Sequence, residues 1–157
     1  MIKTSDNIIN KAMFTSEREE WETPQDFFEK LNKEFGFQLD VCALPTNAKC
    51  ERYFTPDEDG LKQEWTGVCW MNPPYGREIE KWVKKAYESS LRGATVVCLL
   101  PARTDVKWWH DYCMKAEIRL VRGRMKFVGA GNMAPFPNAV VIFSPASDGC
   151  SYKAIDK

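Results

Sequence analysis

Short apolar runs alternate along this chain with segments of helical periodicity, and this alternation constrains the fold more than any other feature. The runs have the length of strands and are bounded by glycine, proline or polar residues. They cover residues 37–43, 67–71, 95–100, 117–121 and 139–143. Residues 24–35, 77–91 and 104–116 instead repeat apolar side chains at helical spacing. Strands that alternate with helices predict an α/β fold with a mostly parallel sheet.

The C-terminal strands break this alternation. Residues 117–121 and 139–143 have no helix between them, so we expect an antiparallel C-terminal strand at the edge of the sheet. A chain of 157 residues is long enough for one domain with its own core. We therefore expect a single Rossmann-like domain over residues 21–146. A flexible N-terminal arm would precede it (residues 1–20) and a C-terminal tail would follow it (residues 147–157).

Local signals suggest where individual elements begin and end. Thr23 has the residue type of an N-cap, Pro24 suits the first helical position, and Gly36 ends the helical run. Thr104 is expected to cap the helix that continues to residue 116. Residues 49–54 are predicted to form a further short strand.

The tetrapeptide Asn72-Pro73-Pro74-Tyr75 follows the apolar run 67–71 and is the most informative motif. It falls at the carboxyl edge of the predicted sheet, where open α/β proteins bind ligands. An Asn amide oxygen and a backbone carbonyl can accept hydrogen bonds from an exocyclic amine, and the prolines fix φ and remove competing donors. A ring at the end can stack on a planar base. The set would hold an extruded nucleobase, although Asn-Pro-Pro can also be a plain strand-terminating turn.

Composition excludes several classes of protein. No apolar run approaches the ~20 residues of a membrane span, and the polar N-terminus predicts no secretion. Six cysteines without a C-x-x-C pair, together with a single histidine, predict no zinc site. The formal net charge is zero. A non-specific nucleic-acid binder usually carries a basic excess, so contact with a polynucleotide would have to come from local patches.

Several segments in order resemble one known family. They comprise Thr23-Pro24, residues 39–43 with Asn47, residues 53–55 with 59–61, Trp65, the Asn-Pro-Pro-Tyr motif, residues 100–105, residues 123–127 and residues 134–137. In this order they resemble the phage-type DNA N6-adenine methyltransferases, which depend on S-adenosylmethionine. The resemblance covers most of the chain, from Trp21 to Phe143.

The resemblance implies methyl transfer from S-adenosylmethionine to the N6 amine of a flipped-out adenine in DNA. Asn72, Pro73, Pro74 and Tyr75 would then be the catalytic residues. Hydrogen bonds to the Asn72 side-chain oxygen and the Pro73 carbonyl would favour a tetrahedral nitrogen, and Tyr75 would stack on the base. This chemistry requires no metal and no general base before transfer.

Cofactor contacts are expected from the other strand ends and loops. Asp40 is a candidate for the methionine end of the cofactor, and Ala43 follows it in the same turn. Thr23 and Pro24 would contact the cofactor from the preceding segment. Asp57 or Asp59 would accept bonds from the ribose hydroxyls. The turn after the first strand lacks the usual glycines, which departs from the pattern of most methyltransferases.

DNA contacts are expected from a local cluster of cations, Arg119, Arg122, Arg124 and Lys126. Arg103, which follows another strand end beside the proposed site, is a further candidate for a phosphate contact. Phosphate contacts of this kind supply most of the non-specific affinity for DNA. The loop over residues 129–137, rich in Gly and Pro, would reach into a groove or fill the space that the base leaves.

Alternative functions remain consistent with the sequence. An N4-cytosine or RNA amine methyltransferase would use the same chemistry, and an inactive DNA-binding module could share the fold. The expected location is the cytoplasm of a bacterial host, for a protein encoded by a phage or prophage.

Overall fold

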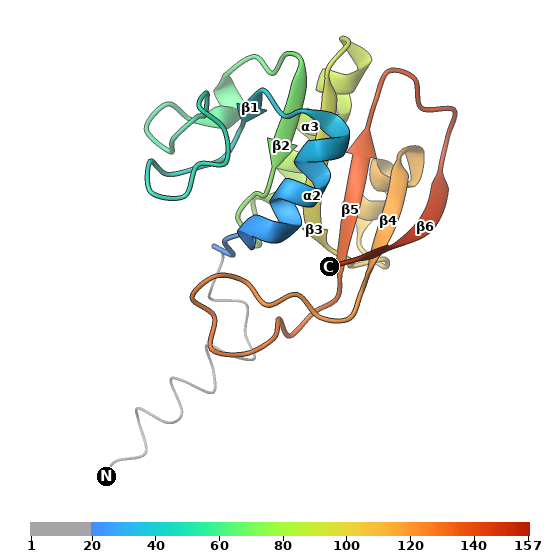
Figure 1. Cartoon of the computed structure of the whole chain (residues 1–157). Coiled ribbons are helices and arrows are strands. Elements are labelled where there is room, and N and C mark those ends of the chain that lie inside the picture. Colours follow the sequence, from blue (N-terminus) through green and yellow to red (C-terminus); the bar gives the residue numbers. More distant parts are fainter. Residues whose placement is uncertain (1–19) are drawn as a thin grey trace.

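The computed structural model describes residues 20–157, which form an α/β fold around one six-stranded sheet (Figure 1). All but the last residue of the expected N-terminal arm lies outside the described residues. The strands are β1 (Leu39–Asp40), β2 (Val68–Met71), β3 (Thr95–Pro101), β4 (Glu117–Arg122), β5 (Asn138–Phe143) and β6 (Ser151–Asp156). Their order in the sheet is β1-β2-β3-β5-β4-β6.

The sheet is parallel except for β5. This strand pairs antiparallel with both β3 and β4, whereas the β1–β2, β2–β3 and β4–β6 pairs are parallel. The expected mostly parallel sheet with an antiparallel C-terminal strand is therefore confirmed. The antiparallel strand is not at the edge, however. It lies in the interior of the sheet, and all six of its residues are buried.

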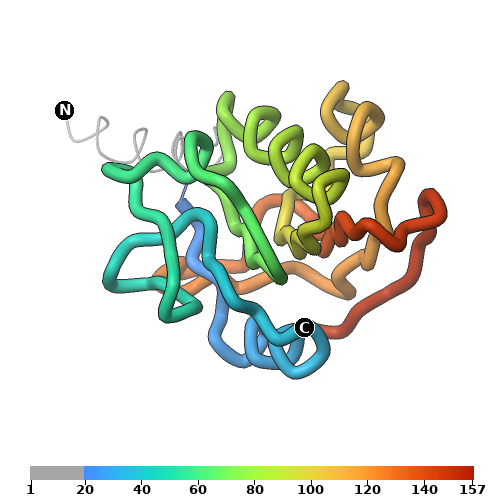
Figure 2. The backbone as a smooth tube through the Cα atoms, turned by 90° about the horizontal axis from the view of Figure 1, so that it is seen from above, coloured from blue at the N-terminus to red at the C-terminus, as the bar shows by residue number. Residues whose placement is uncertain are grey.

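Helices cover both faces of the sheet. The α2 helix (Gln25–Phe35) lies on one face, and α3 (Ile79–Leu91) and α4 (Lys107–Asp111) lie on the other (Figures 1 and 2). Apolar side chains on the inner faces of α2 and α3 recur at helical spacing, as the sequence predicts. The inner face of α2 buries Phe27, Phe28 and Leu31.

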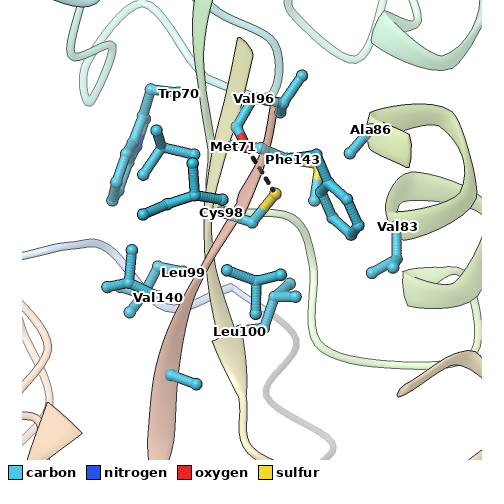
Figure 3. Close-up of a cluster of buried hydrophobic side chains, with 14 of the residues drawn as sticks. Trp70, Met71, Val83, Ala86, Val96, Cys98, Leu99, Leu100, Val140 and Phe143 are labelled. Atoms are coloured by element: carbon cyan, nitrogen blue, oxygen red, sulfur yellow. Dashed lines mark hydrogen bonds between the residues drawn. The ribbon is translucent and has the colours of Figure 1, made fainter. Parts of the chain in front are cut away.

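The core is centred on β3 and β5. Figure 3 shows side chains from β2, β3, β5 and α3 packed around Cys98, whose thiol faces the Val96 carbonyl at 3.9 Å. Leu99, Leu100 and Val140 are fully buried there. Burial on both faces explains why these strands are continuous apolar runs in the sequence.

Three elements differ from the sequence-based expectation. The helix expected over residues 104–116 is shorter, because α4 ends at Asp111 and a 3₁₀ turn follows over Cys113–Lys115. Residues 49–54 contribute only one isolated bridge, between Asp40 and Tyr53. The expected C-terminal tail contains β6, which pairs with β4 along its whole length although most of its side chains are exposed.

Within residues 20–157, no helix has both the length and the apolar composition needed to cross a membrane.

Candidate active site

Asn72 lies immediately after β2, and its side chain is held by the segment that precedes α2. The amide nitrogen donates a 2.9 Å hydrogen bond to Oγ1 of Thr23 and a second bond to the carbonyl of Trp21. The segment before α2 can reach Asn72 because the beginning of α2 lies at the same edge of the sheet as the carboxyl end of β2. The Asn72 amide is therefore fixed by residues that are about fifty positions earlier in the chain.

The orientation of this amide follows from its partners. A carbonyl oxygen only accepts, so the group that faces Trp21 must be the NH₂ of Asn72. The amide oxygen, Oδ1, is buried and has no hydrogen-bond partner among the described residues. An unpaired buried acceptor is costly and is uncommon in folded proteins. The Oδ1 atom thus has the chemistry to accept a hydrogen bond from a bound ligand.

Thr23 does not cap α2, so the expected N-cap is wrong. The helix begins at Gln25, and Pro24 occupies the N-cap position without a side-chain cap bond. The Thr23 hydroxyl is instead directed to Asn72, and the residue is only 1% exposed. Threonine is a common N-cap residue type, but the hydroxyl of Thr23 makes a tertiary contact instead of a capping bond.

Tyr75 does not present its ring to the cleft, contrary to the expected stacking platform. The residue is 3% exposed, and its hydroxyl donates to the Leu99 carbonyl at 2.9 Å. Asn138 donates to the same hydroxyl at 3.3 Å. Phe127 and Phe136 pack edge-on against the ring, with centroids at 6.2 and 5.5 Å. Stacking on a base would require these rings to move, and burial raises the pKa of the Tyr75 phenol.

A cleft of about 470 Å³ opens beside Asn72 at the carboxyl edge of β1 and β2. Pro73 and Pro74 form part of its wall. Trp70, Phe54 and Trp82 supply apolar surface, and the charged lining residues are Glu20, Glu22, Asp40, Lys49, Asp59 and Glu78. Five of these six charged residues are acidic, so the cleft suits a ligand that carries positive charge.

Asp40 lines the cleft at the end of β1, where its carboxylate also organises the following loop. One oxygen accepts from the backbone N–H of Cys42 at 3.2 Å and the other from that of Lys49 at 3.0 Å. Burial raises the pKa of Asp40 to about 6, although these two hydrogen bonds oppose the shift. Asp40 therefore has a demonstrated structural contact in addition to its place in the cleft.

The remaining expected cofactor residues separate into two groups. Ala43, Pro24 and Asp59 lie at or beside the cleft, and the Asp59 carboxylate accepts from the N–H of Leu61 at 3.1 Å. Ala43 and Asp59 are lining residues, whereas Pro24 follows the lining residue Thr23. Asp57 is exposed and is not among the lining residues, so of the two acidic candidates only Asp59 reaches the cleft.

Gly60 supplies a close approach that the sequence analysis missed. A Cβ atom at Gly60 would lie 2.1 Å from the Val41 carbonyl oxygen and 3.1 Å from the Trp82 ring. The loop after β1 and the 3₁₀ turn Gly60–Lys62 can meet only because this side chain is absent. The turn after β1 contains no glycine, but the 3₁₀ turn that packs against it requires glycine at residue 60. Gly60 can be seen in the sequence, but the sequence does not show that it packs against the carbonyl of Val41.

The expected cluster of cations is only partly a free surface. Arg119 is 6% exposed and is paired with Glu34 and Glu117, so its assignment to a DNA-binding patch is wrong. Arg122 is exposed but pairs with Asp156 at 3.0 Å.

Arg103, Arg124 and Lys126 are exposed at the edge of the sheet that carries Asn72. They follow the carboxyl ends of β3 and β4, which run in the same direction as β2. Arg124 also donates to the Ala134 carbonyl at 3.4 Å. No group of three or more His, Cys, Asp or Glu residues within 20–157 is arranged to hold a metal ion.

The loop between β4 and β5 closes over the segment before α2. The N–H of Val128 donates to the Glu22 carbonyl at 3.0 Å, and the ring of Trp21 contacts Phe127 and Phe136 at 5.3 and 5.2 Å. Figure 1 shows this loop beside the beginning of α2. Trp21 was not expected in the site, because its contribution to Asn72 is a backbone carbonyl and has no residue-type signal.

Comparison with known proteins gives consistent results. The family described as DNA N-6-adenine-methyltransferase (Dam) matches residues 11–140. A DNA N-6-adenine-methyltransferase of Haemophilus phage HP1 is 30% identical over 150 residues, which cover 88% of this chain and 86% of the phage protein. Another, from Escherichia phage T1, is 33% identical over 97 residues, which cover 60% of this chain and 40% of that protein.

Among solved structures, a predicted O-methyltransferase from Agrobacterium tumefaciens is similar with a TM-score of 0.39 and 19% identity. The match covers 83% of this chain and 62% of that one. A likeness this distant carries no argument about the site.

Proposed function

Because this chain belongs to the DNA N-6-adenine-methyltransferase (Dam) family, we propose that it transfers a methyl group from S-adenosylmethionine to the N6 amine of adenine in DNA. The observation that carries this proposal within the structure is the Asn72 amide. It lies at the end of β2 on the wall of a cleft, and its oxygen is an acceptor without a hydrogen-bond partner among residues 20–157.

The reaction requires the target amine to be made nucleophilic. The N6 lone pair of adenine is delocalised into the ring, so the amine is a weak nucleophile. Its two protons would donate to Asn72 Oδ1 and to the Pro73 carbonyl, which favours a tetrahedral nitrogen with a localised lone pair. The lone pair of N6 held in this way would accept the methyl group that S-adenosylmethionine supplies when bound, with the electron pair of the broken S–C bond left on sulfur. The cationic N6 afterwards releases one proton to water.

The residues of the cleft fit S-adenosylmethionine. A sulfonium and an ammonium outweigh its single carboxylate, so the cofactor is a net cation, and it would enter a mostly acidic cleft of about 470 Å³. When bound, it supplies an electrophilic methyl group. Asp40 would bind the ammonium, Asp59 the ribose hydroxyls, and Trp70 or Phe54 the adenine ring. Ala43 would line the turn beside Asp40.

The proximity of Asn72 to this cleft supports a direct transfer. Two reactants held in alignment can gain much of their rate from positioning. Enzymes that modify a base cannot reach its target atom inside a duplex, so the target adenine would be extruded from the helix, at a cost of a few kcal/mol. Arg103, Arg124 and Lys126 would contact phosphates at the same edge, and Arg122 would contribute after release from Asp156. The protein would act in the cytoplasm of a bacterial host, encoded by a phage or prophage.

The test is methylation of DNA by the full chain. Unmethylated DNA made by PCR is incubated with S-adenosylmethionine that carries a deuterated methyl group, digested to nucleosides and measured by mass spectrometry. The expected product is deuterated N6-methyladenine, with Asn72→Ala as the inactive control. Deuterated N4-methylcytosine, or label in RNA alone, would replace the adenine assignment by the corresponding amine. Absence of label in every nucleoside would leave only a binding function.

A further inference from the structure

We propose that Thr23 is a positioning residue: its hydroxyl accepts the second N–H of the Asn72 amide, whose orientation the Trp21 carbonyl sets, and so holds the amide with its oxygen, and not its NH₂, toward the target amine. The inference rests on the proposed function, in which Asn72 Oδ1 accepts a hydrogen bond from the base. It differs from the cofactor contact expected of Thr23 from the sequence.

The hydrogen bonds of Asn72 are divided unequally between the protein and the cleft. Both N–H groups of the amide have acceptors, namely Thr23 Oγ1 at 2.9 Å and the Trp21 carbonyl. The oxygen has none among the described residues. The protein therefore uses the whole donor capacity of this side chain and leaves its acceptor capacity for a ligand.

This division matters because the two ends of an amide have nearly the same shape. The terminal torsion of Asn is broad and roughly two-fold, so the side chain can turn over unless its partners forbid it. A turned amide would present NH₂ to the N6 amine, which is also a donor, and the bond that localises the lone pair would be lost. Thr23 is 1% exposed, so water cannot readily replace its hydroxyl as the acceptor.

The fixed orientation also defines the class of base that the site accepts. An acceptor that the described residues leave without a partner can pair with an exocyclic amine, as in adenine N6 or cytosine N4. A keto oxygen at the same place, as in guanine or thymine, would face Oδ1 with an unpaired acceptor. A site with a fixed hydrogen-bonding group rejects such a mismatch strongly, because buried polar atoms remain unpaired.

The kinetic test compares Thr23→Val with Thr23→Ser in the full chain. Valine keeps the size of threonine and removes the acceptor, whereas serine keeps the hydroxyl. We expect Thr23→Val to lower kcat for PCR-made DNA about tenfold, equivalent to about 1.4 kcal/mol. The Kd for S-adenosylmethionine and the KM for DNA should change less than twofold, and Thr23→Ser should retain kcat within twofold of the wild type. A wild-type kcat in Thr23→Val, or a loss confined to cofactor affinity, would overturn the proposal.

A second measurement is made on the wild-type protein and needs no Thr23 variant. In ¹⁵N-labelled full-length protein without cofactor, the side-chain NH₂ of Asn72 is assigned by its absence from the Asn72→Ala spectrum. Its hydrogen exchange should be at least tenfold slower than that of the exposed Asn132 side chain. Equal exchange rates in an active wild-type enzyme would overturn the role of Thr23 and leave the proposed function standing. A wild type that methylates no DNA would overturn both.

Discussion

Arg119 on β4 forms a two-pronged ion pair with Glu34 on α2, in which the two terminal guanidinium nitrogens lie 2.7 and 2.6 Å from the two carboxylate oxygens. Its Nε also donates to Glu117 at 2.5 Å. The Arg119 side chain is 8% exposed, whereas that of Glu34 is 50% exposed. The pair joins a helix to the sheet and keeps a buried cation neutralised, so the charge of Arg119 is withdrawn from any contact with DNA.

Replacing Glu34 with Gln removes the ion pair with Arg119 and should lower the free energy of unfolding at pH 7. The loss should be only about 1 kcal/mol, because the exposed carboxylate is screened by water. The Arg119 guanidinium holds the pKa of Glu34 below its usual 4.5. Its stabilisation is therefore complete above that pH and is lost as the pH falls through the lower folded-state pKa. Urea unfolding of both proteins at pH 7 and pH 3 measures the effect. A difference of the same size at both pH values would contradict this account.

The apolar strands of the fold were predictable because strands that are buried on both faces consist of consecutive apolar residues. The interior strands β3 and β5 are continuous apolar runs, and a missing helix between β4 and β5 correctly indicated a reversal of direction. The β6 strand was not predictable. It pairs through its backbone with β4 while its side chains remain largely exposed, so no period of apolar residues marks it.

The candidate site was predictable to the extent that it uses strand ends. Asn72 and Asp40 reach one cleft because parallel strands place their carboxyl ends at the same edge. The surroundings of Tyr75 and Arg119 were not predictable, since a single letter does not reveal which distant side chain pairs with it. The contact of Trp21 with Asn72 could not be predicted from the sequence, because it uses a backbone carbonyl and every residue has one.

Replacing Tyr75 with Phe should lower the free energy of unfolding by about 1–2 kcal/mol, because the buried Leu99 carbonyl and the Asn138 amide lose a partner. The ring remains, so kcat should stay within threefold of the wild type. Thermal unfolding and steady-state kinetics measure the two effects. Tyr87→Phe is the matched control, because its hydroxyl makes no hydrogen bond within the described part of the chain. Unchanged stability in Tyr75→Phe would contradict the inward role of its hydroxyl.

Replacing Asp40 with Asn should make the stability difference from the wild type depend on pH. Burial raises the folded-state pKa of Asp40 to about 6, from a usual 3.8. The stability that the acid contributes is therefore complete below 3.8 and is lost as the pH rises through 6. Relative to Asp40→Asn, the wild type should lose about 3 kcal/mol between pH 3.5 and pH 7. Urea unfolding at intervals of half a pH unit tests this, and a constant difference would contradict it.

Replacing Arg103, Arg124 or Lys126 singly with Ala should weaken binding to DNA of any sequence. Each change should reduce the slope of log affinity against log salt by roughly 1, as expected for one lost phosphate contact. Arg122→Ala should have a smaller effect, because that residue is paired with Asp156. Fluorescence anisotropy of a labelled duplex at several salt concentrations measures the slopes. Lys33→Ala, in the last turn of α2 just before β1 begins, is the control at the opposite edge. Slopes in the edge variants equal to that of Lys33→Ala would place the DNA elsewhere.

Replacing Asn72 with Ala should abolish methyl transfer and leave cofactor binding largely intact. The substitution removes the acceptor for the target amine, but the acidic residues that would hold the cofactor, Asp40 and Asp59, remain in the cleft. We expect kcat to fall at least about a hundredfold, the effect of losing one positioned catalytic hydrogen bond. Equilibrium dialysis with labelled S-adenosylmethionine should give a Kd within threefold of the wild type. Thermal unfolding with and without cofactor checks this value independently, because a ligand that binds only the native state raises Tm. An equal loss of cofactor affinity would contradict this role. It would indicate that Asn72 contacts the cofactor and not the target base, because the substitution would then have removed a contact to the cofactor.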